Sequence, residues 1–475
     1  MTLIIASVHA RVPEQLDGAD LLEIRIDGMT TKEVADRLPD LLKASPLPTV
    51  VTCRSVAEGG MFEGEEEERI AMYRVALDCE NPPRYLDIEH EILSRHPLLL
   101  DALTSEHTDF ILSWHDIHSR PKDLLKRASD MQSVAGVSIV KMVWRARSLR
   151  DNLEAFFLLQ TRQQPMIALC MGEYGLMSRV LAPKFGGFAV YASVEGQENT
   201  APGQPTTNEL RALYRFDEIN EGTKVYGVIG NNVANSASPA FHNGAFEVAG
   251  TNAVYLPLPI PSGWEHFKAT VLELCDAPHL DFFGASVTIP HKENMRKLLD
   301  VADDNCKASG ATNTLSVCDR KRIGNNTDIQ ALEQLAPNAK RVVVLGGGGV
   351  ARAAVVAMNN IGAEVFVATR KPEQSKELAR ALNCSVANAE IDSIDTIINC
   401  TPVGMEGGND ENGNPLEALL PSLLLAPSMT IIETVYKPKE TPFIQQAQKL
   451  GCAIVTGDEM FRLQAVVQQA LWHKT

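Results

Sequence analysis

SIVKMVW, residues 138–144, is a short apolar run in which polar and apolar side chains do not alternate. Such a run is typical of a strand that is buried on both faces of a parallel sheet. Seven similar runs flank it: LIIASV (3–8), LLEIRID (21–27), PTVVTCR (48–54), RYLDIEH (84–90), FILSWHD (110–116), MIALCMG (166–172) and GFAVYASV (187–194). Helical stretches separate them, as in 66–78, where Ile70, Tyr73 and Leu77 share one face. Eight strands alternating with helices predict a (β/α)8 TIM barrel over residues 1–216.

A polar stretch, DEINEGTK (217–224), is predicted to be a linker, and the strand pattern restarts after it. The next runs are VYGVIG (225–230), AVYLPLPI (253–260), FFGASVTIP (282–290) and TNTLSV (312–317). A third block contains RVVVLGGGG (341–349), EVFVATR (364–370), TIINCTP (396–402), TIIETVY (430–436) and CAIVTG (452–457). Because helical spacers separate these runs, we expect an open, doubly wound α/β sheet.

The composition limits the classes of partner. The 475 residues carry a net charge of −16, which does not favour nucleic acid or an anionic membrane. Nine scattered cysteines without metal-ligand spacing suggest reduced thiols in a cytosol-like compartment. The N-terminus lacks the features of a signal peptide, and no apolar run is long enough to cross a bilayer. We therefore expect a cytoplasmic protein whose partners are small molecules.

Ionisable residues lie at the ends of five consecutive predicted barrel strands. They are Glu23, Arg25, Arg54, Asp87, Glu89, His115 and Lys141. The carboxyl ends of barrel strands form one rim, and the active sites of such barrels lie there. These residues therefore predict a site at that rim.

Lys141, in the middle of the apolar run 138–144, has two interpretations. It pairs with Asp87 or Glu89 across the barrel, or it is a Schiff-base nucleophile whose pKa is lowered by burial. In the second case His115, at the end of the preceding strand, supplies a base near neutral pH.

Six motifs make the first half resemble the type I 3-dehydroquinate dehydratases: EIRID (23–27), TCRSVAEGG (52–60), SWHDIH (113–118), IVKMV (139–143), MSRVLAPKFG (177–186) and TAPGQ (200–204). The resemblance implies that this barrel dehydrates 3-dehydroquinate to 3-dehydroshikimate without a metal. Lys141 would form an imine with the substrate ketone, His115 would remove the adjacent proton, and Glu58 would orient His115. The implied substrate-binding residues are Glu23, Arg25, Arg54, Met171, Arg179, Tyr191, Thr200 and Gln204, with the Arg179 guanidinium on the carboxylate.

Three features depart from the usual pattern of that family. Leu169 stands where a second Met is usual, Tyr191 stands where Phe is usual, and two extra residues precede TAPGQ. These positions affect packing and lid length rather than the type of reaction. A class I aldolase, which also uses a barrel lysine, is the alternative, although the EGG and APGQ loops argue against it.

The segment VVVLGGGGVARAAV (342–355) follows a predicted strand and opens a helix. Glycines there allow a tight turn and bring phosphates close to the helix N-terminus. The next strand ends in Thr369 and Arg370, where an NAD site usually has an acidic residue for the ribose. An arginine favours a 2′-phosphate instead, so we expect NADP(H) as the cofactor.

Seven motifs make residues 223–475 resemble shikimate dehydrogenases: GNNVANSASPAFHN (230–243), GASVTIPHKEN (284–294), SGATNTL (309–315), GNNTDIQA (324–331), NCTPVGM (399–405), TVYKPKETPF (434–443) and GDEMFRLQAV (457–466). The resemblance implies a substrate-binding domain at 225–327, completed by a C-terminal helix at 457–475, and an NADP-binding Rossmann-like domain at 328–456. Lys292 and Asp328 would form the acid–base pair. The implied substrate-binding residues are Ser236, Ser238, Ser286, Thr288, Asn313, Tyr436 and Gln464, with Ser236 and Ser238 on the carboxylate. The implied cofactor-binding residues are Gly346, Gly348, Gly349, Val350, Ala351, Thr369, Arg370, Asn399, Thr401 and Gly457.

The product implied for the first half is the substrate implied for the second half. We therefore expect one chain to carry both activities and to make shikimate for aromatic amino acid biosynthesis. Quinate dehydrogenase activity on the same scaffold is one alternative, and Ser236, Ser238 and Arg370 argue for shikimate and NADP(H) instead. A regulator that binds these metabolites without turnover is another alternative, and the presence of all the catalytic residues argues against it.

Overall fold

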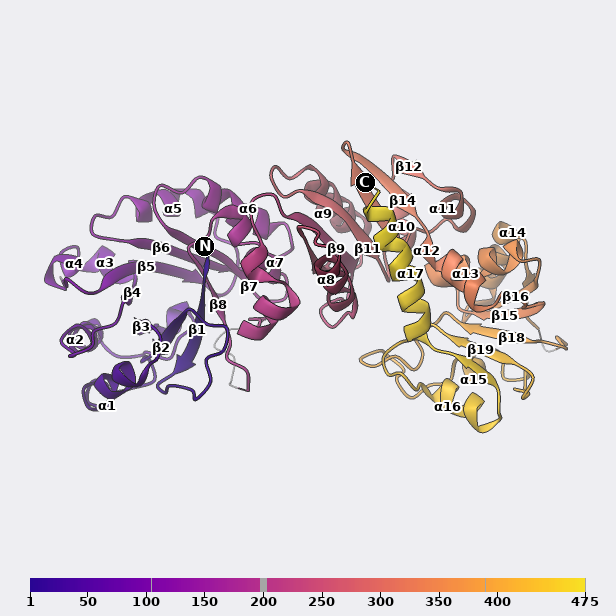
Figure 1. Cartoon of the computed structure of the whole chain (residues 1–475), viewed down its shortest axis with the longest axis horizontal. Helices are drawn as coiled ribbons and strands as arrows, with labels where there is room; N and C mark the ends of the chain where they lie inside the picture. The colour runs from indigo at the N-terminus through magenta and orange to yellow at the C-terminus, as the bar shows by residue number, and fades with distance from the viewer. Residues whose placement is uncertain (104, 197–202, 389, 475) are drawn as a thin grey trace. The chain divides into compact units, whose positions relative to one another are not determined.

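Figure 1 shows the computed structural model of the chain, which describes residues 1–103, 105–196, 203–388 and 390–474. The chain forms two compact units. One comprises Met1–Val225, Phe246–Pro259 and Ala277–Asp281, and the other comprises Tyr226–Ala245, Ile260–Asp276 and Phe282–Thr475. In the described ranges no helix combines the length and the apolar composition that crossing a membrane requires.

The first unit contains a parallel eight-stranded sheet in the order β7-β6-β5-β4-β3-β2-β1-β8. The backbone N–H of Phe188 donates to the carbonyl of Met166 (2.8 Å) and joins the starts of the two outermost strands, so the sheet nearly closes on itself. The strands are β1 (Leu3–His9), β2 (Leu21–Arg25), β3 (Thr49–Thr52), β4 (Tyr85–Glu89), β5 (Asp109–Asp116), β6 (Ile139–Arg145), β7 (Met166–Met171) and β8 (Ala189–Ala192). Each strand falls on one of the eight apolar runs, so the predicted barrel is confirmed.

The helices between these strands are α1 (Thr31–Ala44), α2 (Glu66–Leu77), α3 (His90–Arg95), α4 (Leu99–Ala102), α5 (Leu124–Gln132), α6 (Asp151–Gln160) and α7 (Leu176–Val180). The buried face of α2 differs from the predicted one. Tyr73 is buried as expected, but Ile70 and Leu77 are only half-buried and Arg69 is buried instead. The reason is an ion pair, because Nη1 of Arg69 donates to Oε2 of Glu89 at the end of β4 (2.7 Å).

The second sheet has the order β10-β9-β11-β13-β14-β12. Its strands are β9 (Lys224–Gly230), β10 (Ala253–Pro259), β11 (Phe282–Val287), β12 (Val301–Ala302), β13 (Thr314–Cys318) and β14 (Lys321–Asn325). The helices of this region are α8 (Ser238–Val248), α9 (Trp264–Asp276), α10 (Lys292–Arg296), α11 (Asp304–Ser309) and α12 (Thr327–Leu335). β14 was not predicted, and it forms a hairpin with β13 through Asp319 (φ 49°) and Arg320 (φ 60°).

The third sheet is parallel in the order β17-β16-β15-β18-β19-β20, the doubly wound arrangement that was predicted. Its strands are β15 (Arg341–Leu345), β16 (Glu364–Ala368), β17 (Ser385–Val386), β18 (Thr396–Asn399), β19 (Thr430–Glu433) and β20 (Ala453–Val455). The helices are α13 (Gly349–Asn360), α14 (Pro372–Leu382), α15 (Pro415–Leu419), α16 (Pro442–Lys449) and α17 (Gly457–Trp472). Separate apolar cores lie on the two faces, because Val342 and Val344 pack with α13 whereas Val343 and Leu345 pack with Phe443 of α16.

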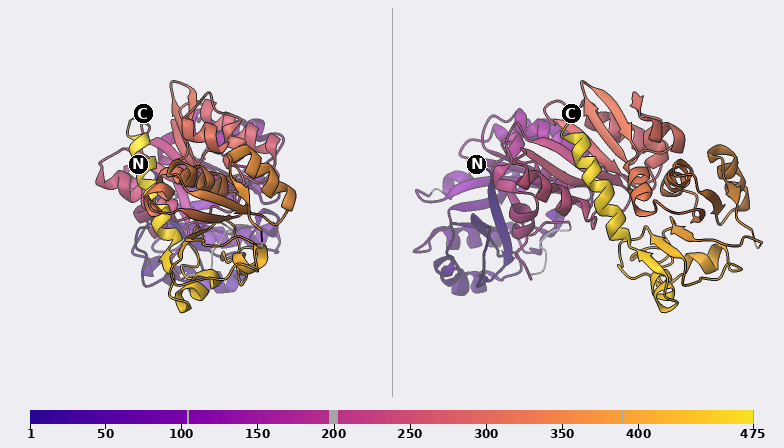
Figure 2. Two further views of the ribbon diagram at one scale, coloured as in Figure 1. Left: turned by 90° about the vertical axis from the view of Figure 1, so that its right-hand side faces the viewer. Right: turned by 45° about the vertical axis from the view of Figure 1, so that its right-hand side comes forward.

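The last helix, α17, starts beside the third sheet and runs back to the second one, and it is the long yellow helix of Figure 2. Its indole, Nε1 of Trp472, donates to the carbonyl of Leu315 (3.0 Å). Nε2 of Gln468 donates to the hydroxyl of Thr314 (3.0 Å). The helix therefore connects the end of the chain to strand β13.

Candidate active sites

A cavity of about 330 Å³ lies at the carboxyl ends of the barrel strands. Its lining includes Glu23, Arg25, Arg54, Glu58, His115, Lys141, Met171, Arg179, Tyr191 and Gln204. These are the barrel residues predicted for catalysis or substrate binding, except Thr200, which lies outside the described residues. The fold thus brings together side chains that are far apart in the sequence.

Lys141, in β6, is only 3% exposed. Its Nζ lies 2.9 Å from Oδ2 of Asp87 and 3.9 Å from Oε1 of Glu23. Nζ also lies 3.9 Å from the ring centroid of Tyr191. Burial lowers the pKa of Lys141, although the carboxylates of Asp87 and Glu23 oppose this change. The predicted ion pair with Asp87 is confirmed, and the paired amine lines the cavity, as the Schiff-base interpretation requires.

Asp87, in β4, was predicted as one of two possible partners of Lys141, and the structure places it in contact with that amine. It is buried, and its Oδ1 accepts hydrogen bonds from Nη2 of Arg54 (2.8 Å) and the hydroxyl of Ser113 (2.5 Å). Burial works against its ionisation, but Arg54 and Lys141 lower the pKa of Asp87 to about 2. Asp87 is therefore the permanent counter-ion of the amine. Its place at a strand end was the sequence signal for this pairing.

His115 and Glu58 form a buried pair in which Nδ1 of His115 lies 2.8 Å from Oε2 of Glu58. Burial, with help from Arg54 and Lys141, lowers the pKa of His115 well below its usual range, so the imidazole is neutral. Burial also raises the pKa of Glu58 to about 8, although Arg54 at 3.1 Å opposes the shift. Loss of that proton leaves a carboxylate that accepts from the Nδ1–H of His115. The other ring nitrogen is then free to act as a base.

The family resemblance implies a dehydration in this cavity, and the His115–Glu58 pair predicts its pH dependence. We expect kcat/KM for 3-dehydroquinate to rise as the pH approaches about 8 and then to level off, because Glu58 loses its proton near that pH. Initial rates over neutral and alkaline pH measure the profile. Glu58→Gln should remove the step and leave the pH profile of shikimate oxidation unchanged. A wild-type profile that is flat through pH 8 would contradict this assignment.

Other predicted barrel residues have protein partners of their own. Arg25 makes a two-point ion pair with Asp27 (2.7 and 2.8 Å), and the hydroxyl of Thr52 donates to Oε1 of Glu23 (2.7 Å). Glu23 also accepts from the hydroxyl of Ser7. These contacts fix the side chains at the cavity wall before any ligand binds.

Arg179, in α7, is a buried cation that is 3% exposed. Its Nη1 donates to the carbonyl of Tyr191 (3.1 Å), and within the described residues no carboxylate neutralises it. Burial lowers the pKa of Arg179 to about 10. A planar cation without a counter-charge suits a substrate carboxylate. The hydroxyl of Tyr191 is likewise buried without a hydrogen-bond partner in the described structure, so this departure from Phe adds an unused donor.

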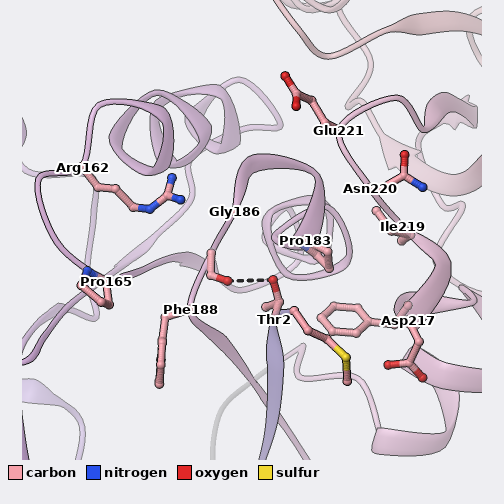
Figure 3. Close-up of a pocket in the computed structure, with 13 residues that line it drawn as sticks. Thr2, Arg162, Pro165, Pro183, Gly186, Phe188, Asp217, Ile219, Asn220 and Glu221 are labelled. Carbon is pink, nitrogen blue, oxygen red and sulfur yellow. Dashed lines mark hydrogen bonds between the residues drawn. The ribbon is translucent and has the colours of Figure 1, made fainter.

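A larger depression of about 850 Å³ lies at the opposite end of the barrel, and Figure 3 shows its lining. Thr2 and Phe188, which precede β1 and β8, belong to it. The hydroxyl of Thr2 donates there to the carbonyl of Gly187 (2.7 Å). The depression contains none of the residues predicted for function, so size does not identify the reactive end of this barrel.

The second unit contains the predicted acid–base pair. Nζ of Lys292 lies 2.5 Å from Oδ2 of Asp328, and both residues are buried. Lys292 begins α10 and Asp328 lies in the first turn of α12, so the pair joins the N-terminal ends of two helices. Nδ2 of Asn313 donates to Oδ1 of Asp328 (2.8 Å) and fixes the carboxylate.

The predicted substrate-binding residues Asn313 and Gln464 lie beside this pair. Oε1 of Gln464 is 3.4 Å from Nδ2 of Asn313 and 3.4 Å from the hydroxyl of Thr327. Ser286, in β11, donates to Oε1 of Gln468 (2.9 Å) and is thus tied to α17. The C-terminal helix therefore supports this wall of the site.

The remaining predicted substrate residues lie on neighbouring loops. The N–H of Ser238 donates to the hydroxyl of Ser236 (3.2 Å) at the start of α8. Thr288 follows β11 and packs on Gly230 at the end of β9. A Cβ added to Gly230 would lie only 2.4 Å from the methyl group of Thr288. The Tyr436 ring has its centroid 5.7 Å from that of Phe461 in α17.

The glycine turn after β15 fits the pyrophosphate of a dinucleotide. Gly346 has φ 120°, and a Cβ there would lie 2.9 Å from the carbonyl oxygen of Cys400. Gly348 is the N-cap of α13, has no side-chain cap among the described residues, and borders open space. The first N–H groups of α13, where Val350 and Ala351 follow, are therefore available to an anion. A Cβ on Gly349 would lie 2.7 Å from Cβ of Lys292, so the turn adjoins the acid–base pair.

The other predicted cofactor residues surround this turn. Arg370 is exposed just after β16, and the hydroxyl of Thr369 donates to the carbonyl of Lys371 (2.7 Å). Oδ1 of Asn399 accepts from the N–H (3.0 Å) and the hydroxyl (2.7 Å) of Thr401. Gly457 begins α17. The glycine turn and the open start of α13 thus fit a dinucleotide, and the role of Arg370 at the ribose stays a prediction.

Comparisons with known proteins assign each half of the chain to a family. The profile of the type I 3-dehydroquinase family matches residues 6–221, and that of the shikimate dehydrogenase substrate-binding domain matches residues 228–315. The chain is 34% identical over 480 residues to the chloroplastic bifunctional 3-dehydroquinate dehydratase/shikimate dehydrogenase of Arabidopsis thaliana, covering 95% of this chain and 77% of that protein. It is 29% identical to the shikimate biosynthesis protein AroDE of Chlamydia pneumoniae, covering 97% and 92%.

Longer relatives and a solved structure also align. The chain is 27% identical to the pentafunctional AROM polypeptide of Komagataella phaffii, of which it spans only 31%. The structure of dehydroquinate dehydratase and shikimate dehydrogenase from S. pombe AroM covers 99% of this chain at 23% identity, with a TM-score of 0.41. On the family matches and the Arabidopsis relative, the chain belongs to the bifunctional 3-dehydroquinate dehydratase/shikimate dehydrogenase family.

Proposed function

We propose that the barrel dehydrates 3-dehydroquinate at Lys141. The supporting observation is a buried amine, paired with Asp87, in a cavity that also contains the His115–Glu58 pair and the unneutralised Arg179. The substrate carboxylate pairs with Arg179. The substrate ketone condenses with Nζ of Lys141, so that a C=N bond forms and water leaves.

The imine makes the adjacent C–H bond acidic, and His115 takes that proton. The electron pair of the C–H bond forms a C=C bond while the neighbouring hydroxyl leaves as water with the proton from His115. Glu58 holds the imidazole in place through Nδ1. Hydrolysis of the imine then releases 3-dehydroshikimate and restores the amine of Lys141.

The second unit then reduces 3-dehydroshikimate to shikimate. NADPH, when bound at the glycine turn, supplies the hydride. Ser236 and Ser238 hold the substrate carboxylate, and Asn313 and Gln464 hold hydroxyl groups. Lys292 donates the proton that the new hydroxyl gains, and Asp328, 2.5 Å away, relays a proton from water back to the lysine.

A single assay tests both steps. Purified protein mixed with 3-dehydroquinate and NADPH should form shikimate, detected by loss of NADPH absorbance and by mass spectrometry. Faster turnover of quinate with NAD than of shikimate with NADP would favour quinate dehydrogenase instead. Tight binding of these metabolites with no turnover at either site would favour a metabolite-sensing regulator.

Arg370 is predicted to select NADP over NAD. Because a charge-assisted hydrogen bond contributes about 1.5–3 kcal/mol, Arg370→Ala should raise KM for NADP about 10–100-fold and leave KM for NAD nearly unchanged. Steady-state kinetics of shikimate oxidation with each nucleotide measure both values. Arg380→Ala, an exposed arginine of α14, is the matched control. Equal effects on the two nucleotides would show that Arg370 does not contact the 2′-phosphate.

The cytosol is the proposed compartment. All nine cysteines are unpaired, as expected where thiols stay reduced. Fractionation of the source cells with an antibody to this chain tests the location, and recovery in an organelle or the periplasm would overturn it.

A further inference from the structure

Glu433, the last residue of β19, is a carboxylate with no exposed surface. Its oxygens accept hydrogen bonds from Nδ2 of Asn399 (2.8 and 3.0 Å), the N–H of Val435 (2.9 Å) and the hydroxyl of Thr441 (3.0 Å). Within the described chain no cation pairs with it. A buried carboxylate held by neutral donors alone is costly unless every donor stays in place.

These donors belong to three different segments of the nucleotide-binding sheet. Asn399 ends β18, Val435 follows β19, and Thr441 is the N-cap of α16. The hydroxyl of Thr441 also accepts from the N–H of Ile444 (3.3 Å). One carboxylate therefore fixes the spacing of two loops and a helix start.

On one side Glu433 determines the orientation of the Asn399 amide. Because the NH2 group faces Glu433, the amide oxygen faces Thr401 and accepts from its N–H and its hydroxyl. This turn packs on the glycine turn, since a Cβ on Gly346 would lie 2.9 Å from the carbonyl oxygen of Cys400 and 3.3 Å from Cγ2 of Thr401. These contacts connect Glu433 to the glycine turn that is predicted to bind the dinucleotide.

On the other side Glu433 holds the segment that supports α17. A Cβ on Gly457 would lie only 2.3 Å from the carbonyl oxygen of Val435, so the helix start rests directly on this segment. Gln464 of the same helix lies 3.4 Å from Asn313, which in turn holds Asp328. The contacts lead from Glu433 to the acid–base pair.

We propose that Glu433 is a positioning residue. It fixes the position of the cofactor turn at 399–401 relative to the start of helix α17, which lies on the substrate side. Glu433 is fully buried and acts through its contacts with Asn399 and Val435. The inference rests on the proposed NADP-linked dehydrogenase and goes beyond it, because it names a residue outside the predicted site that controls both surfaces.

Glu433→Gln tests the proposal. It replaces one acceptor oxygen with an NH2 group, which cannot accept a hydrogen bond from the donors that face it. The Asn399 amide then loses part of its pairing with residue 433 and is free to change its orientation. In metal sites, loss of a residue that supports a ligating side chain typically costs 10–100-fold in metal affinity or activity, and we expect a loss of the same order here. We therefore expect the Kd of NADPH, measured by fluorescence titration, to rise about tenfold or more. kcat/KM for shikimate should fall by at least the same factor, and dehydration of 3-dehydroquinate should be unchanged.

Thr441→Val is the matched control, since it removes one donor and the cap of α16 but leaves the pairing with Asn399 intact. Its NADPH Kd should change less than about threefold, although its thermal midpoint should fall. Asn399→Leu should repeat the effect of Glu433→Gln, and the double variant should show non-additive losses. Glu433→Asp, which keeps two acceptor oxygens, should retain more affinity than Glu433→Gln.

An unchanged NADPH Kd in Glu433→Gln, or an equal effect of Thr441→Val, would overturn the proposal. If Glu433→Gln does not fold, Glu433→Asp and Asn399→Leu decide by the same titration. A wild-type protein that binds NADPH without oxidising shikimate would refute the proposed function instead, and the titrations would still test Glu433.

Discussion

Lys141→Arg is expected to lower dehydration of 3-dehydroquinate by about 10⁴-fold or more, the size of loss seen when a covalent catalyst is removed. Arginine keeps a positive charge beside Asp87, so the buried ion pair survives, but a guanidinium does not form an imine. Formation of 3-dehydroshikimate, followed by absorbance, measures the loss. Oxidation of shikimate by the same sample should be unchanged, because Lys292 and Asp328 belong to a separate site.

Trapping with borohydride provides a second readout of the same prediction. Wild-type protein incubated with 3-dehydroquinate and then reduced should carry one adduct, on the peptide that contains Lys141. Lys141→Arg should carry none, whereas Lys122→Arg, at an exposed position, should be labelled like the wild type. Dehydration retained within about tenfold in Lys141→Arg would leave Lys141 as a structural partner of Asp87.

Asp328→Asn is expected to slow shikimate oxidation about 10²–10⁴-fold, the usual contribution of a general acid–base group. Asparagine has the same shape, but it does not exchange a proton with Lys292, whose Nζ lies 2.5 Å from the carboxylate. KM for NADP should change little, because the glycine turn is not altered. Steady-state kinetics at saturating shikimate measure the change in kcat.

Two further variants show whether Asp328 acts in a pair. Asp319→Asn, at the exposed hairpin between β13 and β14, should keep full activity. The double variant Lys292→Met/Asp328→Asn should lose little more than the worse single variant, since groups that act as a unit are not additive. A loss in Asp328→Asn confined to nucleotide affinity would assign Asp328 to binding rather than to proton transfer.

The strands that build both sites could be predicted because they are apolar on both faces. β6 and β15 are buried along nearly their whole length, and only a continuous apolar run satisfies that environment. β14 was missed for the opposite reason. Its residues Lys321–Asn325 lie between β13 and the edge strand β12 and are mostly half-buried, so local composition resembles that of a loop. Its pairing depends on the β13 hairpin, which sequence periodicity does not reveal.

The same distinction applies to the sites. Lys141 and His115 could be predicted from their place at strand ends and from the family resemblance. The pairing of Asp87 with Lys141 could be predicted only as one of two choices, because the sequence does not show whether Asp87 or Glu89 reaches the amine 54 positions away. The role of Glu433 could not be predicted, because its hydrogen-bond donors come from three segments. These segments meet only because of the order of strands in the sheet. Arg69 took an inward position only because a buried Glu89 attracts it.

The buried guanidinium of Arg179 also ties ligand binding to folding. Without a ligand, the folded barrel holds a desolvated cation that an unfolded chain would expose to water, and this difference subtracts from stability. A bound carboxylate supplies the missing charge to the folded state only. By mass action it then raises the free energy of unfolding by RT ln(1 + [L]/Kd). On the proposed binding of the substrate carboxylate to Arg179, we expect the substrate-bound barrel to resist unfolding better than the ligand-free barrel.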